Sequence, residues 1–413
     1  MSADERPSAG QTAIRAVTYG EGLSGTNLER AGDHNQRVTL QAIRANGPVT
    51  RADLAEITGL TAPAIANITR RLLNEGMILK AGRLLGGRGQ PATKLVVNPN
   101  GAFSIGLNID RDHITIVALD FTGQVRARQS REVHFAMPDE VVRFVESALT
   151  QIRAEKAIDF DRLIGMGIGM PDDLGRVRLP NRPEAYEVWS DINISELFAP
   201  LVNVPIIQEN DAAAASIGEM QFGHGLQTHS FIYTLISAGL GGGLVINGHY
   251  FRGADGRSGE IGFLPVSVMS DDGHKTATLQ DEVSLSALYA RLNAADIPVS
   301  TPQDLEGLSG KGLTVIDQWI SDAAAHLHAP FLTLSCAINP EAHYIGGRVP
   351  AAFLEELCAR LNAAYGQLSD TRIPKIAEVK RAALAVDAAA RGAGILPFNE
   401  RFLPTREALM KTA

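Results

Sequence analysis

The sequence predicts an α/β protein in which a small helical module precedes a larger body of two lobes. Its 413 residues exceed the roughly 100–200 residues of a single domain. Residues 30–98 carry ten Lys or Arg against four Asp or Glu, a net charge of +6, whereas the whole chain has a net charge of −8. Apolar residues recur at helical spacing in this basic segment, and strand patterns alternate with helical patterns after it.

The composition is that of an ordinary globular protein, with 45% hydrophobic and 20% charged residues. No apolar run approaches the roughly 18 residues that span a bilayer, and the first ten residues contain no apolar signal segment. Two cysteines, Cys336 and Cys358, exclude a disulfide scaffold and a four-cysteine zinc site. We therefore expect a cytoplasmic protein without a membrane segment. Residues 1–29, rich in small and polar residues, are expected to form a flexible tail.

The basic segment 30–98 has the pattern of three short helices. We expect Asp33 to cap the first, Thr50 to cap the second with Asp53 in a capping box, and Thr61 to open the third. Gly59 is expected to end the second helix. The apolar side chains at helical spacing should face the core of the module; they are Val38, Leu40, Ile43, Leu54, Ile57, Ile65, Ile68 and Leu72.

Two predicted strands, Met77–Lys80 and Thr93–Val97, flank a glycine-rich loop after the third helix. Three helices and such a hairpin make a winged helix-turn-helix, whose third helix enters the major groove of DNA. The alternative is a small helical interaction domain with solvated arginines. The local excess of positive charge favours contact with DNA.

The third helix would present polar side chains on the face opposite its core. Asn67 is suited to an adenine edge, and Arg70 to a guanine edge or a phosphate. Arg88 lies between glycines in the loop, and a side chain placed so can enter a narrow minor groove. The candidate DNA-binding residues are Thr61, Pro63, Asn67, Arg70, Arg71 and Arg88.

After Asn98-Pro99 the pattern changes to strands that alternate with helices. Predicted strands cover Ser104–Ile109, Ile114–Leu119, Val125–Arg128, Leu163–Gly169, Val204–Gln208 and Phe231–Ile236, with helices at Pro138–Ala154 and Ala212–Gly218. About 315 residues of such alternation suggest two lobes.

Six stretches of this body resemble, in order, the motifs of the ROK family of repressors and sugar kinases. They are Ile105–Asp110, Gly167–Pro171, Pro205–Glu219, Gly239–Gly248, Gly256–Gly262 and Ile338–Gly347. The resemblance implies a ribonuclease H-like body of the actin and sugar-kinase type. It places the small lobe at 99–210 plus about 385–402 and the large lobe at 211–384. The winged helix with its Gly-Arg-Gly-Gln-Pro-Ala loop resembles the repressor branch.

The resemblance also implies a sugar site. Asp211 stands at the position of the kinases' general base, here vestigial, and Asn210 and Glu260 at positions that hydrogen-bond sugar hydroxyls. The residues themselves leave alternatives: Asp211 also fits the cap of the following helix, and both roles can hold at once, whereas Glu260 is alternatively a surface carboxylate in a turn.

Two positions depart from the family pattern at this site. Phe263 replaces a histidine that contacts sugar and zinc, and Gln280 replaces a glutamate that contacts sugar. The family's three zinc cysteines are missing from 272–279, and His274 there is expected to be a solvated loop residue. We expect no zinc and no cofactor. Phe263 can stack on a sugar face, so the candidate effector-binding residues are Asn210, Asp211, Glu260, Phe263 and Gln280.

The two phosphate loops depart as well. The first carries Arg111 and Asp112 where the kinases have glycines, and the second carries Ala238 where they have a threonine. Because phosphoryl transfer depends on positioning and charge stabilisation, we expect no enzyme activity.

The sequence therefore predicts a DNA-binding transcriptional regulator whose kinase-like body senses a sugar or sugar derivative. The family resemblance implies that this regulator is a repressor. It is expected to be a homodimer or a dimer of dimers on double-stranded operator DNA. An active ATP-dependent sugar kinase with an added DNA-binding domain is one alternative. A regulator without a small ligand is another.

Overall fold

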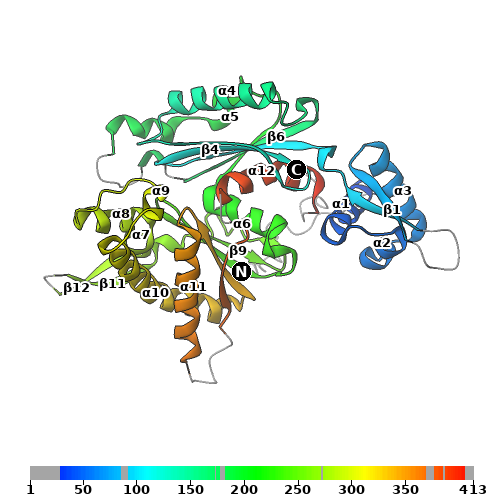
Figure 1. Ribbon diagram of the computed structural model, residues 1–413. Helices are drawn as coiled ribbons and strands as arrows, with labels where there is room; N and C mark the ends of the chain where they lie inside the picture. Colours follow the sequence, from blue (N-terminus) through cyan, green and yellow to red (C-terminus); the bar gives the residue numbers. More distant parts are fainter. Residues whose placement is uncertain are drawn as a thin grey trace, which may run out of the picture.

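The computed structural model describes residues 28–84, 92–172, 174–176, 182–270, 273–368, 376–384 and 387–404. An N-terminal helical module lies beside a body that contains two five-stranded sheets (Figure 1). Among the helices in these ranges, none combines the length and apolar character needed to cross a bilayer.

The N-terminal module is a winged helix-turn-helix, as predicted. Its helices are α1 (Leu28–Asn46), α2 (Arg51–Thr58) and α3 (Ala62–Asn74), and its antiparallel wing strands are β1 (Ile78–Leu84) and β2 (Ala92–Val97). The loop between these strands, with Arg88, falls outside the described residues. Val49 pairs with Leu95 and so connects the segment after α1 to the wing.

The predicted caps of the second and third helices are confirmed. Thr50 and Asp53 form a capping box, Thr61 caps α3, and Gly59 ends α2 with a left-handed φ of 68°. The prediction for Asp33 was wrong. Helix α1 begins at Leu28, because the residues before Asp33 include good helix formers and the helix continues through them.

Most of the predicted core of the module is confirmed: Leu40, Ile43, Leu54, Ile65 and Leu72 are buried, and Ile68 packs against them. Val38 is only half-buried, and Ile57 is 49% exposed. Helix α2 has eight residues and buries Leu54 alone among the described residues. At 3.6 residues per turn these eight residues make little more than two turns, so the face that packs on the module is short and one buried apolar side chain suffices. Ile65 and Leu72 anchor α3 in the core.

The small lobe is built on a sheet of order β5-β4-β3-β6-β7. Its strands are β3 (Phe103–Ile109), β4 (His113–Asp120), β5 (Val125–Glu132), β6 (Leu163–Met170) and β7 (Ile206–Asn210). Alternate residues of β4 face opposite sides: Ile116 and Ala118 join the core that contains α4 (Pro138–Ala154). Val117 and Leu119 join the core that contains α12 (Ala388–Phe402).

The large lobe repeats this topology with a sheet of order β10-β9-β8-β13-β14. Its strands are β8 (Phe231–Ile236), β9 (Leu240–Ile246), β10 (His249–Tyr250), β13 (Ala342–Gly347) and β14 (Glu378–Arg381). In both sheets three antiparallel strands are followed by two parallel ones. The repeat confirms the predicted two-lobed, ribonuclease H-like body.

Helices and a hairpin complete the body. They are α5 (Ile194–Phe198), α6 (Asp211–Phe222), α7 (Leu279–Val283), α8 (Leu285–Ala294), α9 (Pro302–Glu306), α10 (Lys311–Ile338), α11 (Ala351–Gly366), β11 (Pro265–Ser270) and β12 (Gly273–Thr278). Helix α6 follows β7 directly, and α6 and α12 lie side by side between the two sheets (Figure 1).

Candidate functional site

The outer face of α3 is a polar surface presented by the winged helix. Core packing of Ile65 and Leu72 turns the opposite side of the helix to solvent. The predicted DNA-binding residues on this helix are all exposed; they are Thr61, Pro63, Asn67, Arg70 and Arg71. The Arg70 guanidinium donates a hydrogen bond to Asn67 Oδ1 at 3.1 Å, so these two side chains form one polar unit.

Two further contacts involve α3: an ion pair on its surface and a hydrogen bond to α2. Arg71 forms an ion pair with Glu75 at 2.9 Å, which offsets part of its charge. Arg51 of α2 donates from Nε to Thr69 Oγ1 at 2.8 Å and fixes α2 against α3. Sequence patterns did not single out Arg51, because its partner lies on another helix.

The sugar-type residues gather where β7 meets α6. Asn210 caps α6 and accepts hydrogen bonds from the backbone N–H groups of Ala212 and Ala213, at 2.9 and 3.2 Å. Asp211 is buried in the first turn of α6, and its side chain also lines the space between the lobes. Burial, and next the charge of Asp110, raise the pKa of Asp211 to about 7.

Glu260 joins this group through a residue that sequence analysis missed. Asp172, just after β6, bonds to Asn210, and burial and then the charge of Glu260 raise its pKa. Arg257 lies between them, 2.9 Å from Glu260 and 4.0 Å from Asp172. The position of Asp172 at the carboxyl end of a sheet strand was a usable signal, since ligands of open α/β sheets bind at such ends.

Phe263 and Gln280 flank this acidic group. Phe263 ends the short η6 helix (Ile261–Phe263) that Glu260 begins, and its side chain is 57% exposed. Gln280 lies in the first turn of α7, where its Cβ is 3.5 Å from the point a Cβ on Gly262 would occupy. The predicted effector residues thus fall on neighbouring segments, with Phe263 at the solvent edge.

The first phosphate loop holds a charged network in place of glycines. Arg111 follows β3, and its Nε lies 3.0 Å from Asp110 Oδ1. Its guanidinium also packs against the second loop, since one of its nitrogens lies 2.5 Å from the point where a Cβ on Gly239 would sit. Burial opposes the charge of Arg111, but Asp110, Asp211 and Asp112 hold its pKa above the ordinary value.

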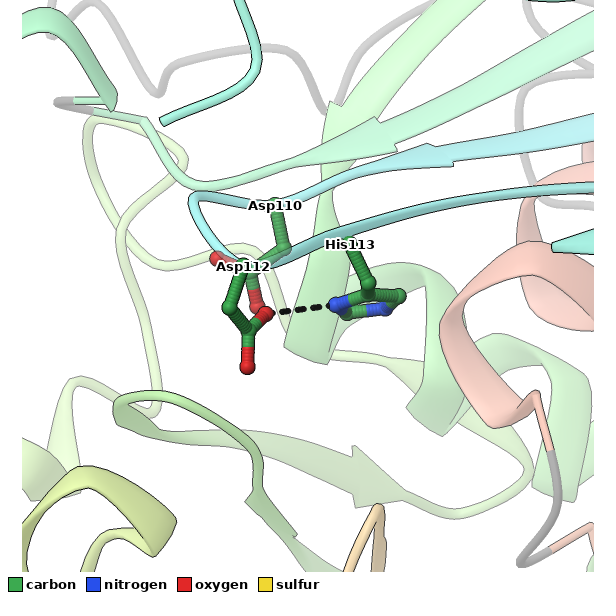
Figure 2. Close-up of side chains that lie close together, drawn as sticks. All are labelled: Asp110, Asp112 and His113. Atoms are coloured by element: carbon green, nitrogen blue, oxygen red, sulfur yellow. Dashed lines mark hydrogen bonds and ion pairs between the residues drawn. The ribbon is translucent and has the colours of Figure 1, made fainter. Parts of the chain in front are cut away.

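Asp112 is paired with side chains on two sides. Its carboxylate contacts His113 Nδ1 at 2.7 Å, a contact visible in Figure 2, and Arg348 at 3.0 Å. Arg348, after β13, also contacts Glu132 of β5. Despite burial, the hydrogen bond and charge of His113, and then Arg348, lower the pKa of Asp112 to about 2. The network joins the two lobes.

Asp110, Asp112 and His113 offer ligand atoms within 4.8 Å of one another (Figure 2). A metal ion bound there would have to compete with the guanidinium groups of Arg111 and Arg348 for the two carboxylates. His113 Nε2 already faces Asn108 Oδ1 at 2.9 Å.

A cavity of about 30 Å³ lies between the lobes next to this network. It can hold a water molecule or two and is far smaller than a nucleotide site. Asp110 Oδ2, buried at this place, has no hydrogen-bond partner within the described part of the chain. The lining residues are Asn108, Asp110, His113, Thr115, Asp211, Leu235, Ser237, Gly347, Arg348, Asp387, Ala388 and Ala389.

Family models match both parts of the chain: the ROK family over residues 104–399, and winged helix-turn-helix DNA-binding over residues 33–78. The xylose repressor of Bacillus subtilis is 30% identical over 240 residues, 56% of this chain and 60% of the repressor. The Escherichia coli DNA-binding transcriptional dual regulator NagC is 24% identical and covers 79% of this chain and 83% of its own.

Two solved structures have the same fold. A ROK family transcriptional regulator, a homologue of the E. coli MLC protein, superposes with a TM-score of 0.64 at 20% identity, over 89% of this chain and 96% of its own. A ROK family glucokinase from Streptomyces griseus, in complex with glucose and AMPPNP, gives 0.55 at 22% identity, over 71% and 99%.

Proposed function

The chain belongs to the ROK family, and on that premise we propose that it is a DNA-binding transcriptional repressor whose body senses a sugar or a sugar derivative. The exposed polar face of α3 carries the proposal, because the core of the module leaves it open to a DNA groove. Asn67 and Arg70 read base edges, while Thr61, Pro63, Arg71 and the wing residue Arg88 contact the backbone or the minor groove. The protein acts in the cytoplasm as a homodimer on a pseudo-palindromic operator.

The effector occupies the cleft beside Asn210, Asp211 and Glu260, with Phe263 and Gln280 at its edge. Four carboxylates and amides there supply acceptors for hydroxyl groups. The relatives named as a xylose repressor and as N-acetylglucosamine repressors support a sugar. Binding changes the closure of the lobes and with it the spacing of the two winged helices, a coupling of about 1–3 kcal/mol in typical cases.

The body acts as a binding domain and not as a kinase. Arg111 packs its guanidinium against the second phosphate loop and forms an ion pair with Asp110 of the first. The retained carboxylate of Asp211 favours the kinase alternative. That alternative requires ATP turnover with D-xylose or N-acetyl-D-glucosamine above the rate of an Asp211→Ala control, and we expect none.

The proposal is tested by selecting duplexes from a random pool with the full-length protein and measuring their affinity at fixed salt. We expect one enriched sequence whose affinity falls in Arg70→Ala and changes with one member of a panel of aldoses, amino sugars and their phosphates. Enrichment with no response to any sugar would support a regulator without a small ligand. No enrichment at all would contradict DNA recognition.

A further inference from the structure

Two helices of the body begin at the cavity between the lobes. Asp211, the first residue of α6, lines it, and so do Ala388 and Ala389, the first residues of α12. With 12 and 15 residues, the helices extend about 18 and 22 Å from this point. In Figure 1 both lie between the sheets and reach toward the winged helix.

The two helices are packed backbone to backbone. A Cβ on Gly392 of α12 would lie 2.0 Å from the Ala214 carbonyl oxygen of α6, and one on Gly218 would lie 2.9 Å from Gly392 Cα. Further along, Gln221 Nε2 donates to Asn399 Oδ1 at 3.2 Å. Close contact of this kind leaves no room for one helix to shift without the other. We therefore treat α6 and α12 as one rigid pair.

The far ends of this pair hold α1 of the DNA-binding module. Arg44 of α1 donates to the carbonyl and the side chain of Gln221, the latter at 2.8 Å. Its guanidinium also lies 4.2 Å from the ring centroid of Phe222. Arg37 donates to the carbonyls of Glu400 and Leu403 at 2.6 and 3.2 Å. These carbonyls belong to a helix C-terminus, where a cation is favoured.

Arg44 makes these bonds in a desolvated setting. Burial lowers its pKa to about 10. Among the described residues, its partners are amide oxygens of Gln41 and Gln221 and the ring of Phe222. Unlike a carboxylate, these groups attract a cation only at the correct distance and direction. A small movement of the end of α6 therefore has a marked effect on the energy of the contact.

We propose that the α6–α12 pair transmits the state of the cavity to the DNA-binding module, with Arg44 and Arg37 as the positioning residues that receive it. A change at Asp211, whether in charge or in its contacts, shifts the pair, and the pair reorients α1. This rests on the proposed function, in which the effector contacts Asp211, a residue that also lines the cavity, and the winged helix binds DNA.

The test is a double-mutant cycle on the full chain between Asp211→Asn and Arg44→Met. The first readout is hydrogen exchange of the amides in the second half of α1, which needs neither DNA nor a sugar. The second is affinity for the selected duplex. We expect Asp211→Asn to change both by more than about twofold in the wild-type background, the margin within which distant independent sites add. In the Arg44→Met background this change should disappear.

Arg153→Met is the matched control. Arg153 lies 4.4 Å above the Phe160 ring, at the end of α4 on the other face of the small-lobe sheet. Its combination with Asp211→Asn should be additive. Arg37→Met provides a second receiving variant if Arg44→Met does not fold.

The coupling would be overturned if Asp211→Asn left the amide exchange rates in α1 unchanged. It would also be overturned if Asp211→Asn changed these rates equally with and without Arg44. If exchange couples as expected but no duplex binds, the coupling stands and the proposed function fails. If duplexes bind but the two substitutions are not coupled, the proposed function stands and the coupling fails.

Discussion

Replacing Arg111 by methionine tests the charged network that fills the phosphate loops. The variant keeps most of the aliphatic stem but removes the cation that faces Asp110 at 3.0 Å and lies near Asp211. Asp112 keeps His113 and Arg348 as partners. Removing one member of a buried ion pair typically costs about 3–5 kcal/mol. We expect the free energy of unfolding to fall by about that amount at pH 8.

The cost should depend on pH in a defined direction. The pKa of Asp211 is about 7 in the presence of Arg111 and rises further without it. A carboxylate with a raised pKa contributes stability that is present at low pH and is lost as the pH rises through that pKa. For a further rise of about one unit, the cost of Arg111→Met should be about 1 kcal/mol smaller at pH 6 than at pH 8.

Urea unfolding followed by tryptophan fluorescence measures this effect, because Trp189 and Trp319 are buried in the small and the large lobe. Arg153→Met serves as an exposed-arginine control. A cost below about 1 kcal/mol at pH 8 is typical of an exposed pair and would refute the reasoning. So would a cost that grows toward low pH.

Three further predictions follow from local contacts. Arg70→Ala should weaken binding to the selected duplex by about 1–3 kcal/mol and relax the sequence preference, whereas Arg71→Ala should weaken binding to all duplexes alike. If both variants lost affinity equally for selected and unrelated duplexes, Arg70 would not read a base. Burial lowers the pKa of His343 to about 4, so the free energy of unfolding should fall by about 2 kcal/mol from pH 7 to pH 5 through this group. His343→Leu should remove that slope from urea titrations, and an unchanged slope would assign it elsewhere. Thr50→Ala removes the cap of α2 and should cost about 1 kcal/mol in thermal unfolding, with Ser restoring most of it.

Sequence predicted the parts of the fold that depend on neighbours along the chain. The capping box at Thr50, the end of α2 at Gly59 and the helix Pro138–Ala154 all follow from side chains within a few residues. The same logic failed at Asp33 and at Ile57. A capping residue can also lie inside a helix, and an apolar residue at the right spacing still needs a neighbour to cover it.

The sequence indicated which residue types form the candidate site, but it did not indicate which side chains contact one another there. Asn210, Asp211 and Glu260 fall near one another, but Asp172, which connects them, belongs to no local pattern. Arg348 meets Asp112 across 236 positions of sequence, and Arg44 meets Gln221 across 177. Such contacts arise from the way two lobes and a module pack, which periodicity along one segment does not encode.

The placement of Arg111 has a consequence for ions in solution. Its guanidinium is attached to the residue next to Asp110, so its local concentration at that carboxylate is set by the geometry of the chain, in the millimolar range or above for so short a tether. A dissolved cation would have to displace a competitor that cannot diffuse away. The protein therefore carries its own counter-ion for Asp110.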